Sequence, residues 1–218
     1  MAPLEPWEKV LVDGEAFPNS IHGLNNCTDC HGGSQSSDKE TAHQGLTANP
    51  SEESEEVCDR CHENITQHSE INLHNNLVGY WSILEERGIS QSNPATHEMF
   101  DNHCAECHAS CGECHVSQPI SVGGGLIEGH IFQRNPSMTR NCTACHGSRV
   151  GNEYLGKNEG VLADVHFRQG RMLCTSCHTG NAMHGNPYEC NTCHMGPEAS
   201  QPAPPDHRYA GVQQPSCE

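Results

Sequence analysis

The chain has few of the residues that normally build a hydrophobic core. Only 33% of its 218 residues are hydrophobic, 15 of these are cysteine, and aromatic residues make up just 5%. With a mean hydropathy of −0.68, this composition approaches that of disordered proteins. A run of about 18 apolar residues is also missing, so the sequence predicts no membrane-spanning helix. A conventional core of packed side chains is therefore excluded.

Positive charge is equally scarce. The chain has 11 Lys and Arg against 28 Asp and Glu, which gives a formal net charge of −17. Such acidity disfavours nucleic acid and anionic lipid as partners. It leaves two interpretations open: the charge keeps the protein soluble, or it forms an acidic docking face for a basic redox partner.

What the chain does have is one cysteine and histidine pattern, Cys-x-x-Cys-His, seven times over. We number these repeats one to seven in chain order. Their cysteines are Cys27 and Cys30, Cys58 and Cys61, Cys104 and Cys107, Cys111 and Cys114, Cys142 and Cys145, Cys174 and Cys177, and Cys190 and Cys193. Their histidines are His31, His62, His108, His115, His146, His178 and His194.

This pattern is the attachment signature of haem c. Two thiols at i and i+3 lie on one side of a helical turn and can add to the two vinyl groups of one haem, while the next residue, His, can bind its iron. Zinc sites and disulfides also use Cys-x-x-Cys, but neither needs His after every pair. The repeats therefore predict seven haem c groups. The porphyrins would supply the missing apolar area, so we expect the chain to fold only with haem in place.

Ten histidines lie outside the repeats, enough to give every iron a second axial histidine. Seven are the favoured distal ligands. Five of them stand alone before or between the repeats: His22, His43, His130, His166 and His184. His74 is chosen for its place on the apolar face of a predicted helix, and His97 because it follows a Pro-Ala-Thr turn. The roles of His68, His103 and His207 are left open, as is the choice of haem that each distal histidine serves. An iron with two histidines has low potential and no open position for a substrate, so we expect no enzyme activity.

Most of the chain reads as turns and loops, because the intervals between repeats are rich in Gly, Asn, Ser and Pro. The predicted fold is mostly irregular with short α-helices, little or no β, and packing around haem. One longer helix is expected over 70–87, with Ser69 as N-cap and Gly88 as its stop. Residues 1–196 are expected to form one multihaem domain and residues 197–218 a Pro-rich tail.

The chain resembles the multihaem c-type cytochromes over residues 22–194. The stretches 141–154, 164–166, 174–178 and 183–185 are similar to exported respiratory cytochromes of anaerobes, as is 104–115. The resemblance implies electron transfer through closely packed haems. Some members polymerise into extracellular filaments, in which a subunit can donate a distal histidine to its neighbour.

From this resemblance we expect a non-enzymatic electron conduit, foremost a subunit of an extracellular filament in anaerobic respiration. Its partners would be copies of itself, redox proteins or extracellular acceptors. A monomeric periplasmic carrier is the alternative, and a multihaem reductase of nitrite, hydroxylamine or a sulfur oxyanion is a third. Prokaryotic haem attachment takes place outside the cytoplasmic membrane, so we expect an exported protein, extracellular or periplasmic, whose signal peptide has been removed. Cys217 remains outside the repeats, as an idle thiol or an intermolecular cross-link.

Overall fold

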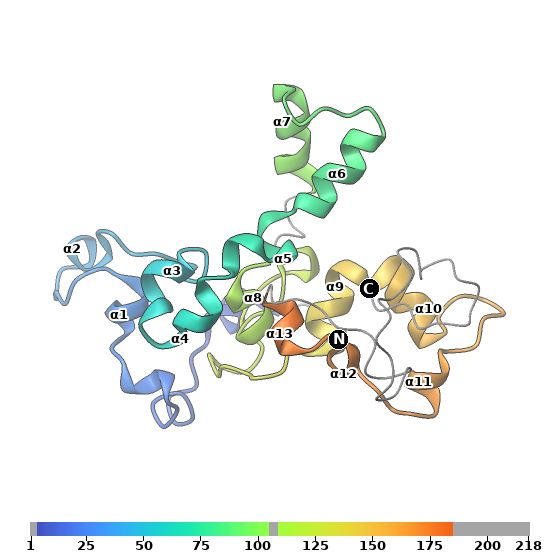
Figure 1. The fold of residues 1–218 in the computed structure, drawn as a ribbon. Helices are drawn as coiled ribbons and strands as arrows, with labels where there is room; N and C mark the ends of the chain where they lie inside the picture. The colour runs from blue at the N-terminus through green and yellow to red at the C-terminus, as the bar shows by residue number, and fades with distance from the viewer. Residues whose placement is uncertain (1–3, 105–108, 185–218) are drawn as a thin grey trace.

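Figure 1 shows an elongated chain of short helices, drawn from a computed structural model that describes residues 4–104 and 109–184. About half of the described residues are helical, and none of them forms a strand. Two isolated β-bridges join Gly32 to Leu46 and Ser117 to Leu126. The prediction of short helices with little β is confirmed. The fraction of helical residues is larger than expected for the predicted mostly irregular fold. The reason is that many loops between repeats contain helical turns of three to five residues.

The α-helices of the described residues are α1 (Cys27–His31), α2 (Lys39–His43), α3 (Ser54–Val57), α4 (Asp59–Thr66), α5 (Leu73–Asn76), α6 (Val78–Glu86), α7 (Pro94–His103), α8 (Cys111–His115), α9 (Thr143–His146), α10 (Asn152–Leu155), α11 (Val165–Arg168), α12 (Cys174–Cys177) and α13 (Gly180–Met183). Short 3-10 or π turns are η1 (Glu8–Val10), η2 (His22–Leu24), η3 (Ser69–Ile71), η5 (Ile120–Val122), η6 (Met138–Cys142) and η7 (Gly147–Gly151).

The single helix predicted over 70–87 was wrong. The segment is divided into η3, α5 and α6, and Leu77 between the last two adopts a left-handed conformation with φ of 55°. The side chain of Asn76 accepts a hydrogen bond from the backbone N–H of Val78 at 3.0 Å. Local bonds of this kind offer the backbone an alternative to the helix, which accounts for the break.

The ends of this segment agree with the prediction only in part. Asn72, not Ser69, caps the helix that carries His74, since its Oδ1 accepts the His74 backbone N–H at 2.9 Å. The predicted stop at Gly88 is confirmed by its φ of 81°, a conformation that glycine adopts without steric cost.

The side-chain core is as small as the composition predicts. Among the described residues the buried apolar side chains are Phe100, Val116 and Met138, while Ile21 and Leu24 remain more than 80% exposed. Phe100 belongs to the hairpin of α6 and α7, which projects from the body of the chain (Figure 1). No described helix is long and apolar enough to span a membrane.

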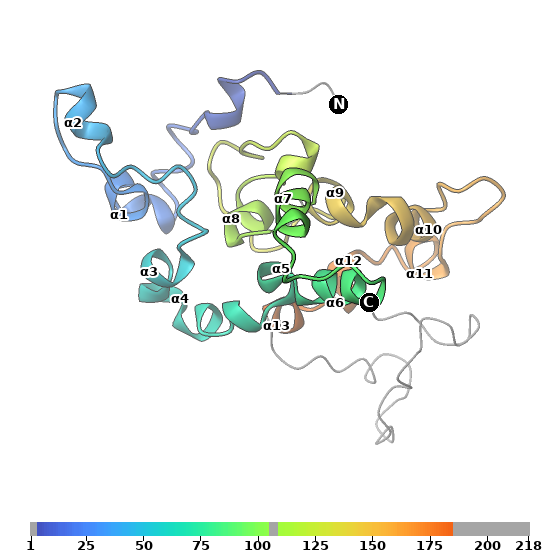
Figure 2. The same cartoon turned by 90° about the horizontal axis from the view of Figure 1, so that it is seen from above.

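The helices that carry the repeats follow one another along the long direction of the molecule. Figures 1 and 2 both place α1 and α4 toward one end, α8 in the middle, and α9 and α12 farther along. The third repeat beyond Cys104, the whole seventh repeat and the predicted tail lie outside the described residues.

A buried amide joins the fourth repeat to the fifth. The Asn141 side chain, 5% exposed, donates hydrogen bonds from Nδ2 to the carbonyl oxygens of Glu113 and Ser117 and accepts one at Oδ1 from the backbone N–H of Ser137. Three bonds on one buried amide satisfy backbone groups of two segments at once, which ties the start of the fifth repeat to α8.

Replacing Asn141 with Ala should therefore destabilise the junction between these repeats. The substitution leaves buried carbonyl and N–H groups unpaired, and we expect the free energy of unfolding to fall by about 2–4 kcal/mol. The matched control is Asn19→Ala, because Asn19 is exposed and makes one bond, to the carbonyl of Glu15. Denaturant unfolding of both variants checks the difference; equal losses would contradict the role given to Asn141.

Candidate cofactor sites

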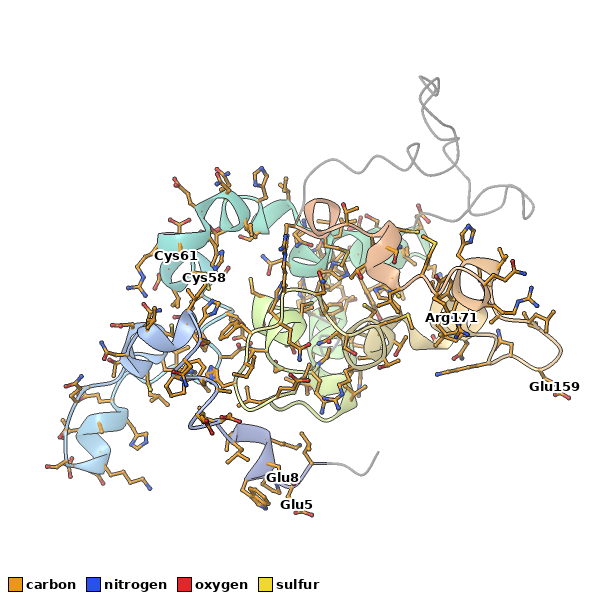
Figure 3. The ribbon with its side chains drawn as sticks, turned by 90° about the horizontal axis from the view of Figure 1, so that it is seen from below. Glu5, Glu8, Cys58, Cys61, Glu159 and Arg171 are labelled. Atoms are coloured by element: carbon orange, nitrogen blue, oxygen red, sulfur yellow. The ribbon has the colours of Figure 1, made fainter. Side chains whose placement is uncertain are left out.

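The five fully described repeats each form a helical turn, as predicted. The first, fourth and sixth repeats begin α1, α8 and α12, the second leads into α4, and the fifth passes from η6 into α9. The two cysteines of each pair thus occupy i and i+3 of one turn, which places them on the same side. Figure 3 shows Cys58 and Cys61 of the second repeat next to each other at the start of α4.

The second variable residue of the repeat caps its own turn in three cases. Its side chain accepts the backbone N–H of the residue before the first cysteine: Asp29 from Asn26 at 2.8 Å, Glu113 from Ser110 at 2.9 Å, and Ser176 from Leu173 at 3.0 Å. Such bonds satisfy a donor at the start of the turn. The repeat therefore carries its own folding signal.

Both cysteines of the first, second, fourth and fifth repeats are free thiols, as are Cys104 and Cys174. Burial raises the pKa of Cys58 and Cys114 to about 11, with smaller contributions from neighbouring sulfur and carboxyl groups. These side chains are therefore sheltered yet available for covalent attachment.

Four repeat histidines lie opposite a histidine from outside the repeats. The ring centres are 5.8 Å apart for His31 and His130, and 6.2 Å for His62 and His22. The other two pairs, with centres 6.0 and 6.1 Å apart, are His115 with His184 and His146 with His74. Among the described residues no three of His, Cys, Asp and Glu gather as one metal-binding group.

The separation within these pairs is that of two ligands on one metal. A coordinating imidazole nitrogen lies about 2 Å from its metal and about 1.1 Å from the centre of its own ring, so two imidazoles on opposite sides of an iron have centres about 6 Å apart. Aromatic rings in ordinary contact have similar separations, so the argument for a shared iron is that each of the four pairs joins one repeat histidine to one other histidine. The residues present thus fit the haem c that the repeats predict.

Two of the repeat histidines are held by the same pair of contacts with a backbone segment. The ring Nδ1 of His31 is 2.9 Å from the carbonyl oxygen of Thr47, whose N–H donates to the His31 carbonyl. His115 makes the same two contacts with Gln133, its Nδ1 lying 2.7 Å from the carbonyl oxygen. A carbonyl accepts only from a protonated Nδ1, so Nε2 is left as the metal-binding nitrogen.

The four opposing histidines are half-buried, and burial lowers the pKa of each. The nearby repeat histidine lowers it further, because two positive charges at this distance repel. The folded chain therefore favours neutral imidazole, the form that binds a metal.

Electrostatic and hydrogen-bond contacts set the repeats in a row. Cys58 lies within electrostatic range of Cys30 and Cys111, which places the second repeat between the first and the fourth. Cys114 is similarly close to Cys145 of the fifth repeat. A side-chain hydrogen bond in turn joins Cys142 of the fifth repeat to Cys174 of the sixth and lowers the pKa of Cys174. The spatial order is thus first, second, fourth, fifth and sixth repeat.

The remaining favoured histidines lie in other settings. His43 is exposed in α2, and its Nδ1 lies 2.7 Å from the carbonyl oxygen of Lys39 in the same helix. The ring of His97 packs against that of Trp81, with centres 5.0 Å apart. Neither has a ring contact with a repeat histidine in the described part of the chain. His166 interacts with Asp164 at 2.9 Å. The assignments of His43, His97 and His166 stay predictions, and the third and seventh repeat histidines, His108 and His194, lie outside the described residues.

The histidines without an assigned role are also distributed along the chain. The His68 Nδ1 lies 3.2 Å from the Asn64 carbonyl, and His103 ends α7. His207 lies outside the described residues, as does Cys217.

Several residues around the pairs were not predicted. Asn72 caps the helix of His74 and also donates through Nδ2 to the carbonyl of Met183, next to His184, so it joins two of the opposing histidines. Phe17 packs against His130, and Phe132 packs against both His22 and His130. The signal available in the sequence was scarcity, since only four Phe are present and each of them lies within five residues of a candidate distal histidine.

Comparison with known proteins finds no relative of this chain. No family model matches the chain, no curated protein does, and no solved structure is similar to it. The assignment of the sites therefore depends on the repeats and the ring pairs alone.

The loop that carries His130 offers a test of how this histidine is held opposite His31. His130 has a φ of 76°, a left-handed conformation that is uncommon for a residue with a side chain and costs on the order of 1–3 kcal/mol. The preceding Gly129 has a φ of 53°, and its carbonyl accepts the Asp13 N–H at 2.8 Å. A Cβ on Gly129 would lie 2.9 Å from the Asp13 backbone nitrogen.

We expect Gly129→Ala to displace this loop, because both the conformation and the contact with Asp13 become unfavourable. Gly160→Ala is the matched control, since Gly160 has a φ of 74° but no neighbouring atom within 4 Å. The control should cost about 1 kcal/mol of unfolding free energy and Gly129→Ala distinctly more. Denaturant unfolding and hydrogen exchange at the Asp13 N–H measure this; equal costs would show that the Asp13 contact does not hold the loop.

Proposed function

We propose that this chain is a non-enzymatic electron carrier that holds seven haem c groups. The observation that carries the proposal is the row of four histidine pairs, each pairing one repeat histidine with one other histidine at the spacing of two iron ligands. Bound haem would supply the redox chemistry, an iron that changes between ferric and ferrous without making or breaking bonds.

The residues of the chain attach, orient and enclose each group. The cysteine pairs provide covalent attachment from one side of a turn, and the repeat histidine provides the first axial ligand. Thr47 and Gln133 hold two of these histidines with Nε2 outward. The exposed apolar side chains, such as Ile21 and Leu24, would lie against macrocycles instead of against one another.

A reductase is less well supported by this arrangement. Reduction of a small oxyanion at haem needs an open iron position, whereas the four pairs would fill both axial positions of their irons. The favoured function is therefore transfer of electrons between neighbouring sites, as the row from the first to the sixth repeat supports.

We propose further that the protein works as a subunit of an extracellular filament in anaerobic respiration, with a monomeric periplasmic carrier as the alternative. A row of repeats that runs along the long direction of the molecule, from α1 toward one end to α9 and α12 past the middle (Figures 1 and 2), suits transfer from one copy to the next. Negative-stain microscopy of native material separates the two forms: polymers support the filament, and uniform particles of a single 23.8 kDa chain with its haems contradict it.

The haem proposal is tested by the intact mass of the protein from an exporting host that attaches haem c. The mass should exceed that of the chain by seven haems. The haems should remain on the protein during acid-acetone extraction, because thioether bonds hold them. A mass equal to the bare chain, or to the chain with zinc, would contradict the proposal.

Replacing His74 tests the pairing itself. We expect His74→Ala to leave seven attached haems while one iron becomes high-spin, since His146 would lose its opposite ligand. Added imidazole should restore the low-spin spectrum. His68→Ala is the control, because the His68 ring lies 3.2 Å from the Asn64 carbonyl of α4 and is not part of any of the four pairs; a high-spin signal in both variants, or in neither, would remove His74 from the ligand set.

The angles between paired rings predict two kinds of ferric signal. The planes are 20° and 22° apart for His22 with His62 and His115 with His184, but 88° and 90° apart for the pairs of His31 and His146. Parallel imidazoles act on the same iron orbital and split the orbital energies, whereas perpendicular ones act on two orbitals equally. Low-temperature EPR should therefore resolve a rhombic and a highly anisotropic low-spin class; one uniform class would contradict these orientations.

A further inference from the structure

An aromatic cluster lies between the first and second sites of the row. The Phe132 ring stacks on His22, with centres 4.1 Å apart and planes 19° apart, and also packs against His130 with centres 5.8 Å apart. Phe17 contacts His130 from 4.7 Å. His22 pairs with His62 of the second repeat and His130 with His31 of the first. Phe132 thus contacts the opposing histidines of two neighbouring sites at once.

Hydrogen bonds fix the backbone on both sides of Phe132. Gln133, the next residue, donates its N–H to the carbonyl of His115, and the N–H of Ile131 donates to Glu128 in a turn. Farther back, the Gly129 carbonyl accepts from Asp13. The phenyl ring is consequently presented from a segment anchored to the N-terminal region and to the fourth repeat, although the side chain itself is 39% exposed.

The two kinds of histidine are oriented in different ways. His31 and His115 are held by hydrogen bonds from Nδ1 to a backbone carbonyl. For His22 and His130 no side-chain hydrogen bond to a ring nitrogen is found within residues 4–104 and 109–184, and their rings contact phenyl faces instead. A stacked aromatic neighbour limits rotation of the imidazole plane, which a hydrogen bond otherwise does.

We propose that Phe132 is a shared positioning residue for the haem sites of the first two repeats, setting the ring planes of His22 and His130 together. The inference rests on the proposed function, because it assigns these histidines to irons. Its consequence is that one substitution outside the ligand set perturbs two irons, one with near-parallel and one with near-perpendicular ligands.

The test uses the full haem-loaded chain with Phe132→Leu, which keeps apolar volume but removes the flat face. We expect seven attached haems by intact mass, together with shifted g-values or loss of low-spin intensity in both EPR classes. Phe132→Tyr keeps the ring and should keep the wild-type spectrum. Phe100→Leu is the control, because Phe100 packs against Tyr80 and Trp81 and contacts none of the paired histidines.

The outcomes separate this inference from the function on which it rests. Wild-type spectra for Phe132→Leu, a change in one class only, or the same change in Phe100→Leu would each overturn the shared role of Phe132. A wild-type chain without attached haem would overturn the proposed function instead. Because the tyrosine variant retains the ring, loss of signal in that variant as well would show that the position tolerates no change and that orientation by the ring is not the cause.

Discussion

The proposed haem-loaded fold depends on one distance, about 6 Å between the centres of two imidazoles on opposite sides of a six-coordinate iron. Four histidine pairs meet it. Each would replace packing that the chain lacks, since its described residues bury only three apolar side chains. Stability would come from cross-links between distant segments, in the way that small metal domains are held, and not from a continuous hydrophobic core.

The pairs also explain how short helices keep a fixed arrangement. His130 comes from the loop after the fourth repeat but faces the first, while His184 follows the sixth repeat and faces the fourth. His74 precedes the third repeat and faces the fifth. If an iron joins the two histidines as proposed, every such connection would close a long stretch of chain, which is entropically costly to form and correspondingly effective at restricting the unfolded state. The local bonds of Asn72 and Asn141 then hold neighbouring segments in place.

The sequence predicted the helical turns of the repeats because a turn is a local structure with its own cap, as Asp29 and Glu113 show. It also identified His22, His74, His130 and His184 as candidates, since nothing else accounted for them. It did not predict which repeat each one faces, because the pairs join segments that are far apart in the sequence. The helix over 70–87 failed because its apolar spacing outweighed the Asn75-Asn76 pair in the prediction, whereas in the structure the Asn76 side chain bonds locally and the helix breaks at Leu77. Phe132 had no periodic signal at all.

The most direct test is an experimental structure of the haem-loaded protein at a resolution that shows axial ligands. It should place one iron between the rings of each pair, His31 with His130, His62 with His22, His115 with His184 and His146 with His74, with thioether bonds to the adjacent cysteines. A structure in which these histidines bind zinc with the cysteines, or face irons in other combinations, would contradict the account.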